Sequence, residues 1–297
     1  DKPHPTPLVS VILRSMDRAT VGQAMASVGA QRYPNIELLI VAASKAIHAP
    51  VPRNAGPFPI KISPPTSKGL GRSEAANLGL EMASGEFALF LDDDDWIEPQ
   101  HIERLVDRLE SEERSGAIAC YSDTRCVDAE GTPRSETFKT PYDPIRLLVG
   151  NFIPIHSCLF RLTPQTRLCQ FDPDLSLYED WDFWMQLSEV GPFLHSKQET
   201  AIYRLGFGSG FGVGGWGSSS ARSAYRQVLD KWRMRWSLDE VESIVERARM
   251  SYSQTSPEDR HAFAANPSPK QNSAINNAAS SMLFRLKRML IPSKSGE

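Results

Sequence analysis

The sequence predicts an α/β fold in which a mostly parallel, mixed central sheet is flanked by helices and followed by a C-terminal helical extension. First, apolar runs of strand length alternate with stretches of helical periodicity, which is the pattern of β-α-β units. Second, the earliest apolar run reads LVSVIL at 8–13, and such β-branched runs are typical of parallel strands buried on both faces. Third, 297 residues with 40% hydrophobic content can bury a core without disulfide or metal staples.

The predicted elements alternate through the first hundred residues and become less regular afterwards. Strands are predicted at 8–13, 36–41, 61–62 and 87–91, and helices at 20–31 and 72–83. After Pro99 an amphipathic helix carries its apolar residues at Ile102, Leu105, Val106 and Leu109. The polar stretch 122–139, with a turn at 128–131, predicts a hairpin that makes the sheet mixed. The remaining predictions are strands at 117–121, 157–161, near Phe193 and at 201–204, and helices at 179–190 and 221–250.

Composition shifts predict four segments along the chain. They are a globular α/β domain at 1–220, a C-terminal helix at 221–250, a Pro- and Ser-rich linker at 251–276 and a basic amphipathic tail at 277–297. Within the tail, residues 278–291 combine Met and Leu with Arg and Lys and contain no acidic residue. Such a helix fits docking on the domain or on a partner, and it also fits peripheral contact with anionic lipid.

Charge, hydropathy and cysteine content exclude several classes of protein. A net charge of -3 gives no general attraction to nucleic acid, so we expect no nucleic-acid partner. The sequence contains no run of about 18 apolar residues that could cross a bilayer. Four cysteines without a C-x-x-C pair fit a reducing, cytoplasmic setting. The opening residues DKPHPTP lack an initiator Met and a signal-peptide pattern, so we expect an excised domain.

An acidic cluster, DDDD at 92–95, follows the fourth predicted strand. Open α/β sheets hold their ligands at this carboxyl edge. Like-charged carboxylates are costly to bury without a compensating cation, so Asp92 and Asp94, as alternate residues leaving a strand, predict a Mg²⁺ or Mn²⁺ site that also accepts a diphosphate. The alternative is an exposed acidic turn before the next helix.

A second carboxylate site is predicted at Glu179-Asp180-Trp181, where a helix begins. Asp180 has a like-charged neighbour and an apolar neighbour, and both raise the pKa of a carboxyl group. We therefore expect Asp180 to act as a general base that takes a proton from an incoming hydroxyl. On the residues alone, an ordinary helix cap explains the same pattern.

In this order, the motifs resemble the inverting family 2 glycosyltransferases, which have the Rossmann-like GT-A fold. The resemblance covers about residues 7–220 and rests on VSVIL, YPNIEL, GRSEAANLGLEMASGEFALFLDDDDWIEP, LFR, YEDWDFW and YR. It matches Asn77 and Gly79 to an N-x-G element, Asp92 and Asp94 to the metal-binding D-x-D, and Asp180 to the catalytic base. It implies a nucleotide-sugar donor, a metal bridging its diphosphate and direct displacement at the anomeric carbon.

The resemblance also implies where the donor binds. The expected donor-binding residues are Arg14, Asp17, Arg72, Asn77, Asp92 and Asp93. Arg14 and Arg72 fit phosphate contacts or solvated surface positions equally well. Family members usually have an acidic pair after the second strand, whereas this chain has Ala42-Ala43, so Asp17 is a candidate substitute acceptor for the base. We expect a UDP-sugar as the donor.

The acceptor side is expected to involve His156, Glu179 and Trp181, although a buried His and a core Trp are equally good interpretations. A glycine-rich stretch at 206–217 predicts a lid over the bound donor. The Q-x-x-R-W element of processive synthases is missing, so we expect addition of one sugar to a glycan or lipid-linked glycan, as in bacterial polysaccharide assembly at the inner face of the membrane. The rival hypothesis is a catalytically degenerate domain that binds a nucleotide or glycan.

Overall fold

The computed structural model describes residues 6–206 and 219–253. The described residues form two compact units, one made of 6–142 and 151–206 and the other of 143–150 and 219–253. Most of the glycine-rich stretch, nearly all of the predicted linker and the basic tail lie outside the described residues, so their predicted roles stay predictions.

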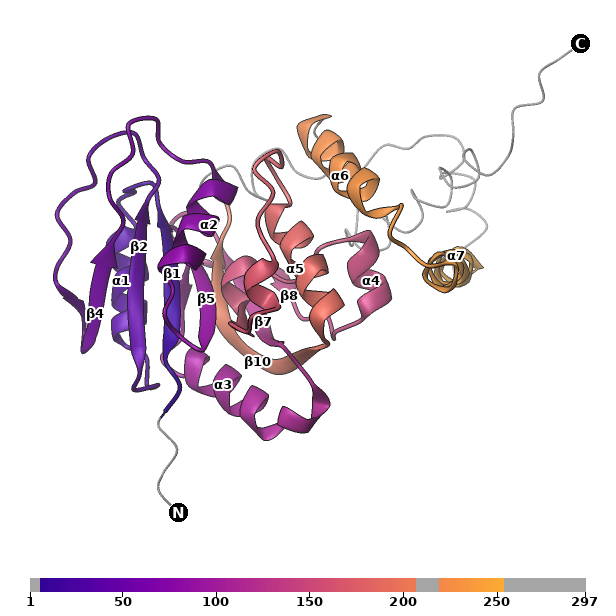
Figure 1. Cartoon of the computed structure of the whole chain (residues 1–297), viewed down its shortest axis with the longest axis horizontal. Coiled ribbons are helices and arrows are strands. Elements are labelled where there is room, and N and C mark those ends of the chain that lie inside the picture. The colour runs from indigo at the N-terminus through magenta and orange to yellow at the C-terminus, as the bar shows by residue number, and fades with distance from the viewer. Residues whose placement is uncertain (1–5, 207–218, 254–297) are drawn as a thin grey trace, which may run out of the picture. The chain divides into compact units, whose positions relative to one another are not determined.

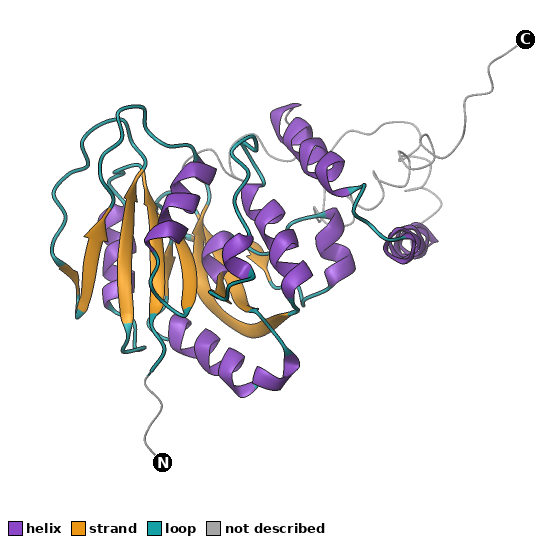
Figure 2. Cartoon of the chain, viewed as in Figure 1, coloured by secondary structure: helices purple, strands orange, loops and turns teal. Residues whose placement is uncertain are grey.

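A mixed sheet forms the centre of the first unit (Figures 1 and 2). Its strands in the described residues are β1 (Val9–Ser15), β2 (Ile36–Ala42), β3 (Asn54–Ala55), β4 (Phe58–Ile62), β5 (Phe87–Asp92), β6 (Trp96–Ile97), β7 (Ala119–Val127), β8 (Pro133–Phe138), β9 (Cys158–Arg161) and β10 (Phe193–Arg204). The order across the sheet is β3-β4-β2-β1-β5-β9-β7-β10-β6, and β8 pairs with β7. Strands β4, β2, β1 and β5 run parallel, whereas β9 is antiparallel to both β5 and β7. The predicted α/β class and mixed sheet are confirmed.

The helices of the first unit cover both faces of this sheet (Figure 1). They are α1 (Val21–Gly29), α2 (Arg72–Met82), α3 (His101–Ser111) and α5 (Glu179–Val190). Alternate residues along β1 point to opposite faces, and Val9, Val11 and Leu13 share one core cluster with residues of α1 and α3. On the other face α2 packs so closely on β1 that a Cβ built at Gly79 would lie 2.2 Å from Cγ2 of Ile12. The close packing of α2 on β1 therefore explains why the N-x-G element has a glycine at position 79.

Aromatic side chains fill the space between α5 and the sheet. The rings of Phe171 and Phe183 stack at 4.2 Å, and Phe90 meets Phe171 edge-on at 5.1 Å. Trp184 is fully buried, and its indole N–H donates to the carbonyl of Ile153 at 3.0 Å. This apolar support fixes the N-terminal end of α5 relative to the ends of β1 and β5.

The second half differs from the predicted elements in two places. Strands near Phe193 and at 201–204 are one continuous strand, β10, because it keeps its parallel pairing with β7 across register shifts around Glu199. The predicted helix 221–250 is two helices, α6 (Ser219–Trp232) and α7 (Leu238–Ser253). Ser237 explains the break: its hydroxyl accepts from the Glu240 N–H, and the Glu240 carboxylate accepts from the Ser237 N–H, which is a capping box.

The second unit also contains a segment that the sequence placed in the 1–220 domain. Helix α4 (Pro144–Val149) belongs with α6 and α7, since Asp143 pairs with Arg247 and the Val149 carbonyl accepts from the Tyr225 hydroxyl at 2.8 Å. Across 6–206 and 219–253, every helix is too short or too polar to cross a lipid bilayer.

Candidate active site

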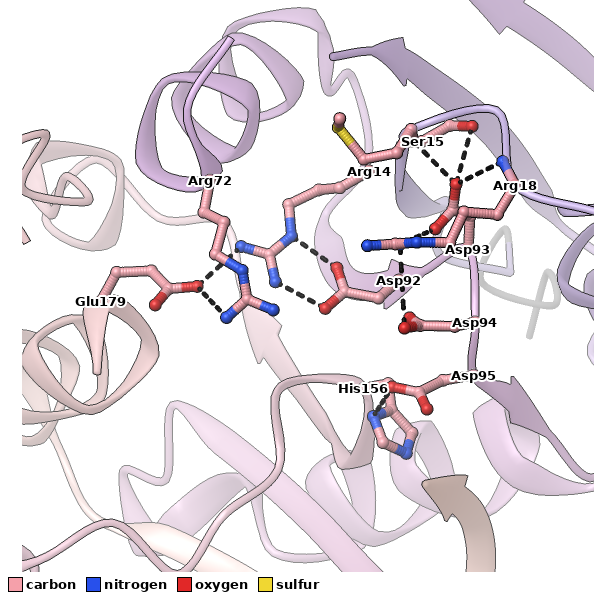
Figure 3. A network of polar contacts seen from close by, with 11 residues as sticks. Arg14, Ser15, Arg18, Arg72, Asp92, Asp93, Asp94, Asp95, His156 and Glu179 are labelled. Atoms are coloured by element: carbon pink, nitrogen blue, oxygen red, sulfur yellow. Dashed lines mark hydrogen bonds and ion pairs between the residues drawn. The ribbon is translucent and has the colours of Figure 1, made fainter. Parts of the chain in front are cut away.

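Charged side chains from distant parts of the sequence meet at the carboxyl ends of β1 and β5 and the start of α5. Figure 3 shows Arg14 and Arg72 between the carboxylates of Asp92 and Glu179, with Asp94 and Asp95 farther along the same turn. Strands β1 and β5 are adjacent and parallel, and Arg14 pairs in register with Asp92. The sheet therefore brings the predicted metal-binding and phosphate-binding residues together.

Arg14 is the centre of a buried ion-pair network. Its Nε and Nη2 donate to the two oxygens of Asp92 at 2.7 and 2.9 Å, and its Nη1 donates to Oε1 of Glu179 at 3.2 Å. Nη1 of Arg72 reaches the same Glu179 oxygen at 3.5 Å. Burial opposes the charge on Asp92, but Arg14 and Arg72 outweigh it and lower the pKa of that carboxyl to about 2. Asp92 therefore stays ionised.

Asp93 faces away from this network, toward the segment that follows β1. Its fully buried carboxylate accepts from the Met16 N–H at 2.7 Å and the Arg18 N–H at 3.3 Å, and it pairs with the Arg18 guanidinium. The Ser15 hydroxyl donates to the same carboxylate at 3.2 Å. Asp93, which was expected to bind the donor, thus holds the β1–α1 connection in place, and both of its carboxylate oxygens already accept hydrogen bonds from that segment.

Asp94 is the carboxylate whose charge has the least compensation. Burial, then the repulsion from Asp95 and Asp92, raises the pKa of Asp94 to about 7, although Arg18 at 3.7 Å opposes this. Oxygens of Asp92, Asp94 and Asp95 lie within 4.8 Å of one another. The negative charge of this cluster exceeds the positive charge around it, and its ligands are oxygen atoms. Such a site fits a hard divalent cation, Mg²⁺ or Mn²⁺.

Asp95 and His156 extend the cluster into the interior. His156 lies on a short 3-10 turn (Ile155–Ser157), and its Nδ1 is 3.2 Å from Oδ2 of Asp95. Burial opposes a charged ring, but Asp95 outweighs it and raises the pKa of His156. The His156 side chain is fully buried and stacks on Tyr203 at 5.8 Å. Of the two interpretations of His156, the buried histidine fits this structure, because the ring is enclosed and lies against Asp95.

Asp180 begins α5 next to Glu179, and it has two donors. Its Oδ1 accepts from the Trp181 N–H at 2.8 Å, and its Oδ2 accepts from Nδ2 of Asn151 at 2.9 Å. Burial, then the charge of Glu179, raises the pKa of Asp180 to about 7, against the smaller opposing effects of the Trp181 N–H and Arg72. A carboxylate with this pKa accepts a proton near neutral pH far better than an ordinary aspartate does.

Three other expected site residues have structural partners. Trp181 is fully buried, which agrees with the alternative that it packs in the core, so its ring cannot contact a sugar in this conformation. The amide of Asn77 donates to the Phe171 carbonyl at 2.9 Å and accepts from the Phe171 N–H at 2.8 Å. Asp17 accepts from the Ala49 N–H at 2.8 Å and adopts a left-handed conformation, with φ of 59°.

The sequence reasoning missed Asp95, Arg18 and Asn151. Asp95 was missed because the D-x-D pattern was interpreted as alternate side chains of an extended strand, which selects Asp92 and Asp94 only. Strand β5 ends at Asp92, and the Asp95 N–H donates to the Asp92 carbonyl at 3.1 Å, so the chain turns there. Four consecutive aspartates were a sufficient signal for including Asp95. Asn151 gave no sequence signal, since it lies 29 residues from Asp180.

Comparison with known proteins places this site in a family context. Residues 10–165 match the family described as glycosyl transferase family 2. Chondroitin synthase of Escherichia coli is 30% identical over 130 residues, which is 43% of this chain and 18% of that protein. The uncharacterized glycosyltransferase YwdF of Bacillus subtilis is 26% identical over 190 residues, covering 61% of this chain and 68% of that protein. The chain thus spans less than a fifth of the chondroitin synthase.

Solved structures show the same fold at low sequence identity. A crystal structure of S. aureus TarS 1-349 in complex with UDP has a TM-score of 0.58 at 15% identity and covers 94% of this chain and 83% of TarS 1-349. The mannosyltransferase PcManGT from Pyrobaculum calidifontis, in complex with GDP-Man and Mn²⁺, has a TM-score of 0.51 at 14% identity and covers 96% of this chain and 89% of that one. The family match spans more than half of the residues and includes the acidic turn, and the GT-A-like fold agrees with it. The chain belongs to glycosyl transferase family 2.

Proposed function

We propose that this chain is an inverting glycosyltransferase that moves one sugar from a nucleoside-diphosphate donor to a hydroxyl of a glycan or lipid-linked glycan. The observation that carries the proposal is that Arg14 and Arg72 lie between Asp92 of the acidic turn and Glu179, the residue next to Asp180 (Figure 3). The pKa values of Asp94 and Asp180, one in each of these two carboxylate groups, are both raised to about 7. Enzymes place acids and bases with perturbed pKa values in active sites.

Asp180 is suited to be the base. With its pKa raised to about 7, Asp180 is present in both protonation states near neutral pH, and the ionised form accepts the proton of the acceptor hydroxyl. The oxygen that loses this proton then attacks the anomeric carbon of the donor, and the nucleoside diphosphate leaves with the electron pair of the broken bond. One displacement inverts the anomeric configuration.

The donor diphosphate requires positive charge. Arg72 offers it: its side chain is 34% exposed, and its ion-pair contact with Glu179, at 3.5 Å, is long. Asp94, with Asp92 and Asp95, would hold Mg²⁺ or Mn²⁺, which supplies charge stabilisation for the leaving diphosphate. Arg14 is less suited than Arg72 to bind the diphosphate, because three of its N–H groups already donate to Asp92 and Glu179.

A UDP-sugar is the favoured donor in this proposal. Structures of the fold neighbour TarS are in complex with UDP and with UDP-GlcNAc, and those names support a uridine nucleotide without fixing the base here. We further propose single addition in the cytoplasm, with the basic stretch 278–291 contacting the membrane. The degenerate-domain hypothesis has one supporting observation, the buried Ala42 and Ala43 where relatives usually carry acids.

The experiment that tests the proposal is a thermal-shift panel of UDP, GDP, dTDP and CMP, and of the matching sugars, with and without Mn²⁺. Wild type is compared with Asp94→Ala and with Asp107→Ala, a control on the exposed side of α3. We expect one nucleotide to stabilise wild type and the control only with Mn²⁺, since a ligand stabilises the state that binds it. The degenerate-domain hypothesis gains if a nucleotide binds but no sugar transfer follows, and the donor site itself is refuted if no nucleotide shifts the melting temperature at millimolar concentration.

A further inference from the structure

Arg204, at the C-terminal end of β10, has a guanidinium that takes no part in the network around Arg14. It is 7% exposed. Its Nε donates to the main-chain carbonyl of Asp94 at 3.0 Å, and its own main-chain N–H donates to Oδ1 of Asp95 at 2.8 Å. One residue therefore holds both the peptide of Asp94 and the carboxylate of Asp95.

The other end of the Arg204 side chain is fixed by separate elements. Its Nη1 donates to the carbonyl of Ala129 in the β7–β8 turn at 2.6 Å, and its Nη2 donates to Oε1 of Gln23 on α1 at 2.5 Å. The guanidinium carbon also lies 4.9 Å from the centre of the Trp96 ring. Because the planar guanidinium is held on three sides, the main chain of the acidic turn is tied to β10, α1 and the β7–β8 turn.

The choice of atoms distinguishes Arg204 from Arg14. Arg14 donates to both carboxylate oxygens of Asp92, so its contacts are made to possible metal-ligand atoms. Arg204 bonds a carbonyl of Asp94 and leaves both Asp94 carboxylate oxygens free of its guanidinium. The repulsion among neighbouring carboxylates would otherwise favour a more open turn. A guanidinium bonded to the main chain of the turn resists that opening and leaves the carboxylate oxygens of Asp94 available, while the Arg204 N–H takes only one oxygen of Asp95.

We propose that Arg204 is a positioning residue that fixes the acidic turn, so that the carboxylates of Asp94 and Asp95 converge on one divalent cation. The inference rests on the proposed function, since it takes the acidic turn as the cation site. It assigns Arg204 no contact with the sugar or with the reacting atoms.

The test measures Mn²⁺ binding by calorimetry, with UDP present, on the full chain. Arg204→Lys keeps the charge but loses the planar fork, and we expect its dissociation constant for Mn²⁺ to rise about tenfold or more. Arg161→Lys is the matched control: Arg161 also donates to a main-chain carbonyl, that of Leu109 at 3.1 Å, and lies 5.0 Å from the Phe87 ring, but it contacts no residue of the acidic turn. Its dissociation constant should stay within about twofold of wild type.

A second variant covers the case in which Arg204→Lys folds poorly. Gln23→Ala removes one anchor of the guanidinium at an exposed position of α1, and it should weaken Mn²⁺ binding in the same direction by a smaller factor. In turnover assays both variants should regain most of the wild-type kcat at saturating Mn²⁺, which a general loss of folded protein would not allow.

Two outcomes overturn the inference in different ways. If Asp94→Ala abolishes Mn²⁺ binding but Arg204→Lys and Gln23→Ala bind as wild type does, the turn is the cation site and Arg204 does not position it. If Asp94→Ala binds Mn²⁺ as wild type does, the cation site of the proposed function is wrong and the role of Arg204 falls with it.

Discussion

Arg14 holds Asp92 through two parallel hydrogen bonds, at 2.7 and 2.9 Å, with the arginine side chain only 6% exposed. This pair joins the ends of β1 and β5, and the third donor of Arg14 adds α5 through Glu179. The first aspartate of the acidic turn is therefore neutralised by two short hydrogen bonds, whereas Asp94 has only Arg18, at 3.7 Å, as an oppositely charged neighbour among the described residues.

Replacing Arg14 should be costly because it leaves a buried carboxylate without its partner. Arg14→Ala is expected to lower the free energy of unfolding by about 3–5 kcal/mol, measured by urea denaturation. The exposed pair of Arg108, on α3, and Glu112, which follows that helix, supplies the control, and Arg108→Ala should cost less than about 1 kcal/mol. Equal losses for the two variants would contradict a structural role for the Arg14 network.

Asp180→Asn should remove the base while leaving donor binding intact. We expect kcat to fall about 10²–10⁴-fold with little change in KM for the donor. In wild type, kcat should rise with pH through about 7, because only the ionised carboxylate accepts the proton. Asp174→Asn, at an exposed position before α5, is the control. A wild-type rate that falls as pH rises from 6 to 8 would speak against Asp180 as the base.

Asn151→Ala should move this pH dependence. Nδ2 of Asn151 donates to Asp180, and the Asn151 amide cannot flip freely because its Oδ1 accepts from the Ile153 N–H at 3.0 Å. A donor to the ionised carboxylate favours that form, so its loss should raise the pKa of Asp180 and shift the rising limb of kcat to higher pH. The same replacement at Asn35, whose exposed amide donates to the Thr6 carbonyl, should leave the limb in place.

Asp94→Asn should stabilise the metal-free protein in a pH-dependent way. The folded pKa of Asp94, about 7, is above its ordinary value, so the folded state loses stability as pH rises between about 4 and 7. The melting temperature of Asp94→Asn measured with a chelator should exceed that of wild type by a few degrees at pH 8. The difference should shrink at pH 5 and vanish below about pH 4. If the difference in melting temperature between Asp94→Asn and wild type were the same at every pH, the ionised Asp94 carboxylate would not be what destabilises the metal-free protein.

Two glycine-to-alanine changes should have opposite effects. Gly79→Ala forces a methyl group against Ile12, 2.2 Å from the ideal Cβ position, and should cost about 1–3 kcal/mol of unfolding free energy. Gly22→Ala on α1 meets nothing within 4 Å and should stabilise by up to about 1 kcal/mol through helix propensity. Chemical denaturation of both variants compares them directly, and a neutral Gly79→Ala would contradict the close approach of α2 to β1.

The sequence predicted the parallel core of the fold because strand and helix periods are local properties. It also predicted an acidic cluster at the end of a strand and a second carboxylate site at the start of a helix, and in the structure Arg14 contacts Asp92 of the first and Glu179 of the second. It could not predict that Asp93 faces the β1–α1 connection, because side-chain direction depends on how the turn after β5 packs. For Trp181 it offered core packing beside an acceptor contact, and the residue is fully buried. Hydrogen bonds across long separations, such as that of Arg204 to Asp94, leave no periodic trace in a single sequence.

Among the described residues, Asp17 and Tyr178 are the non-glycine residues with positive φ, at 59° and 63°. Asp17 lies just after β1, which carries Arg14, and Tyr178 immediately precedes Glu179 at the start of α5. A backbone in this region disfavours a bulky side chain such as Tyr178. Tyr178→Gly would relieve this backbone cost, but it would also remove the ring that meets Trp181 edge-on at 6.1 Å. Added stability is therefore better sought at open positions, such as Gly22 on α1, than at the backbone that leads into the site.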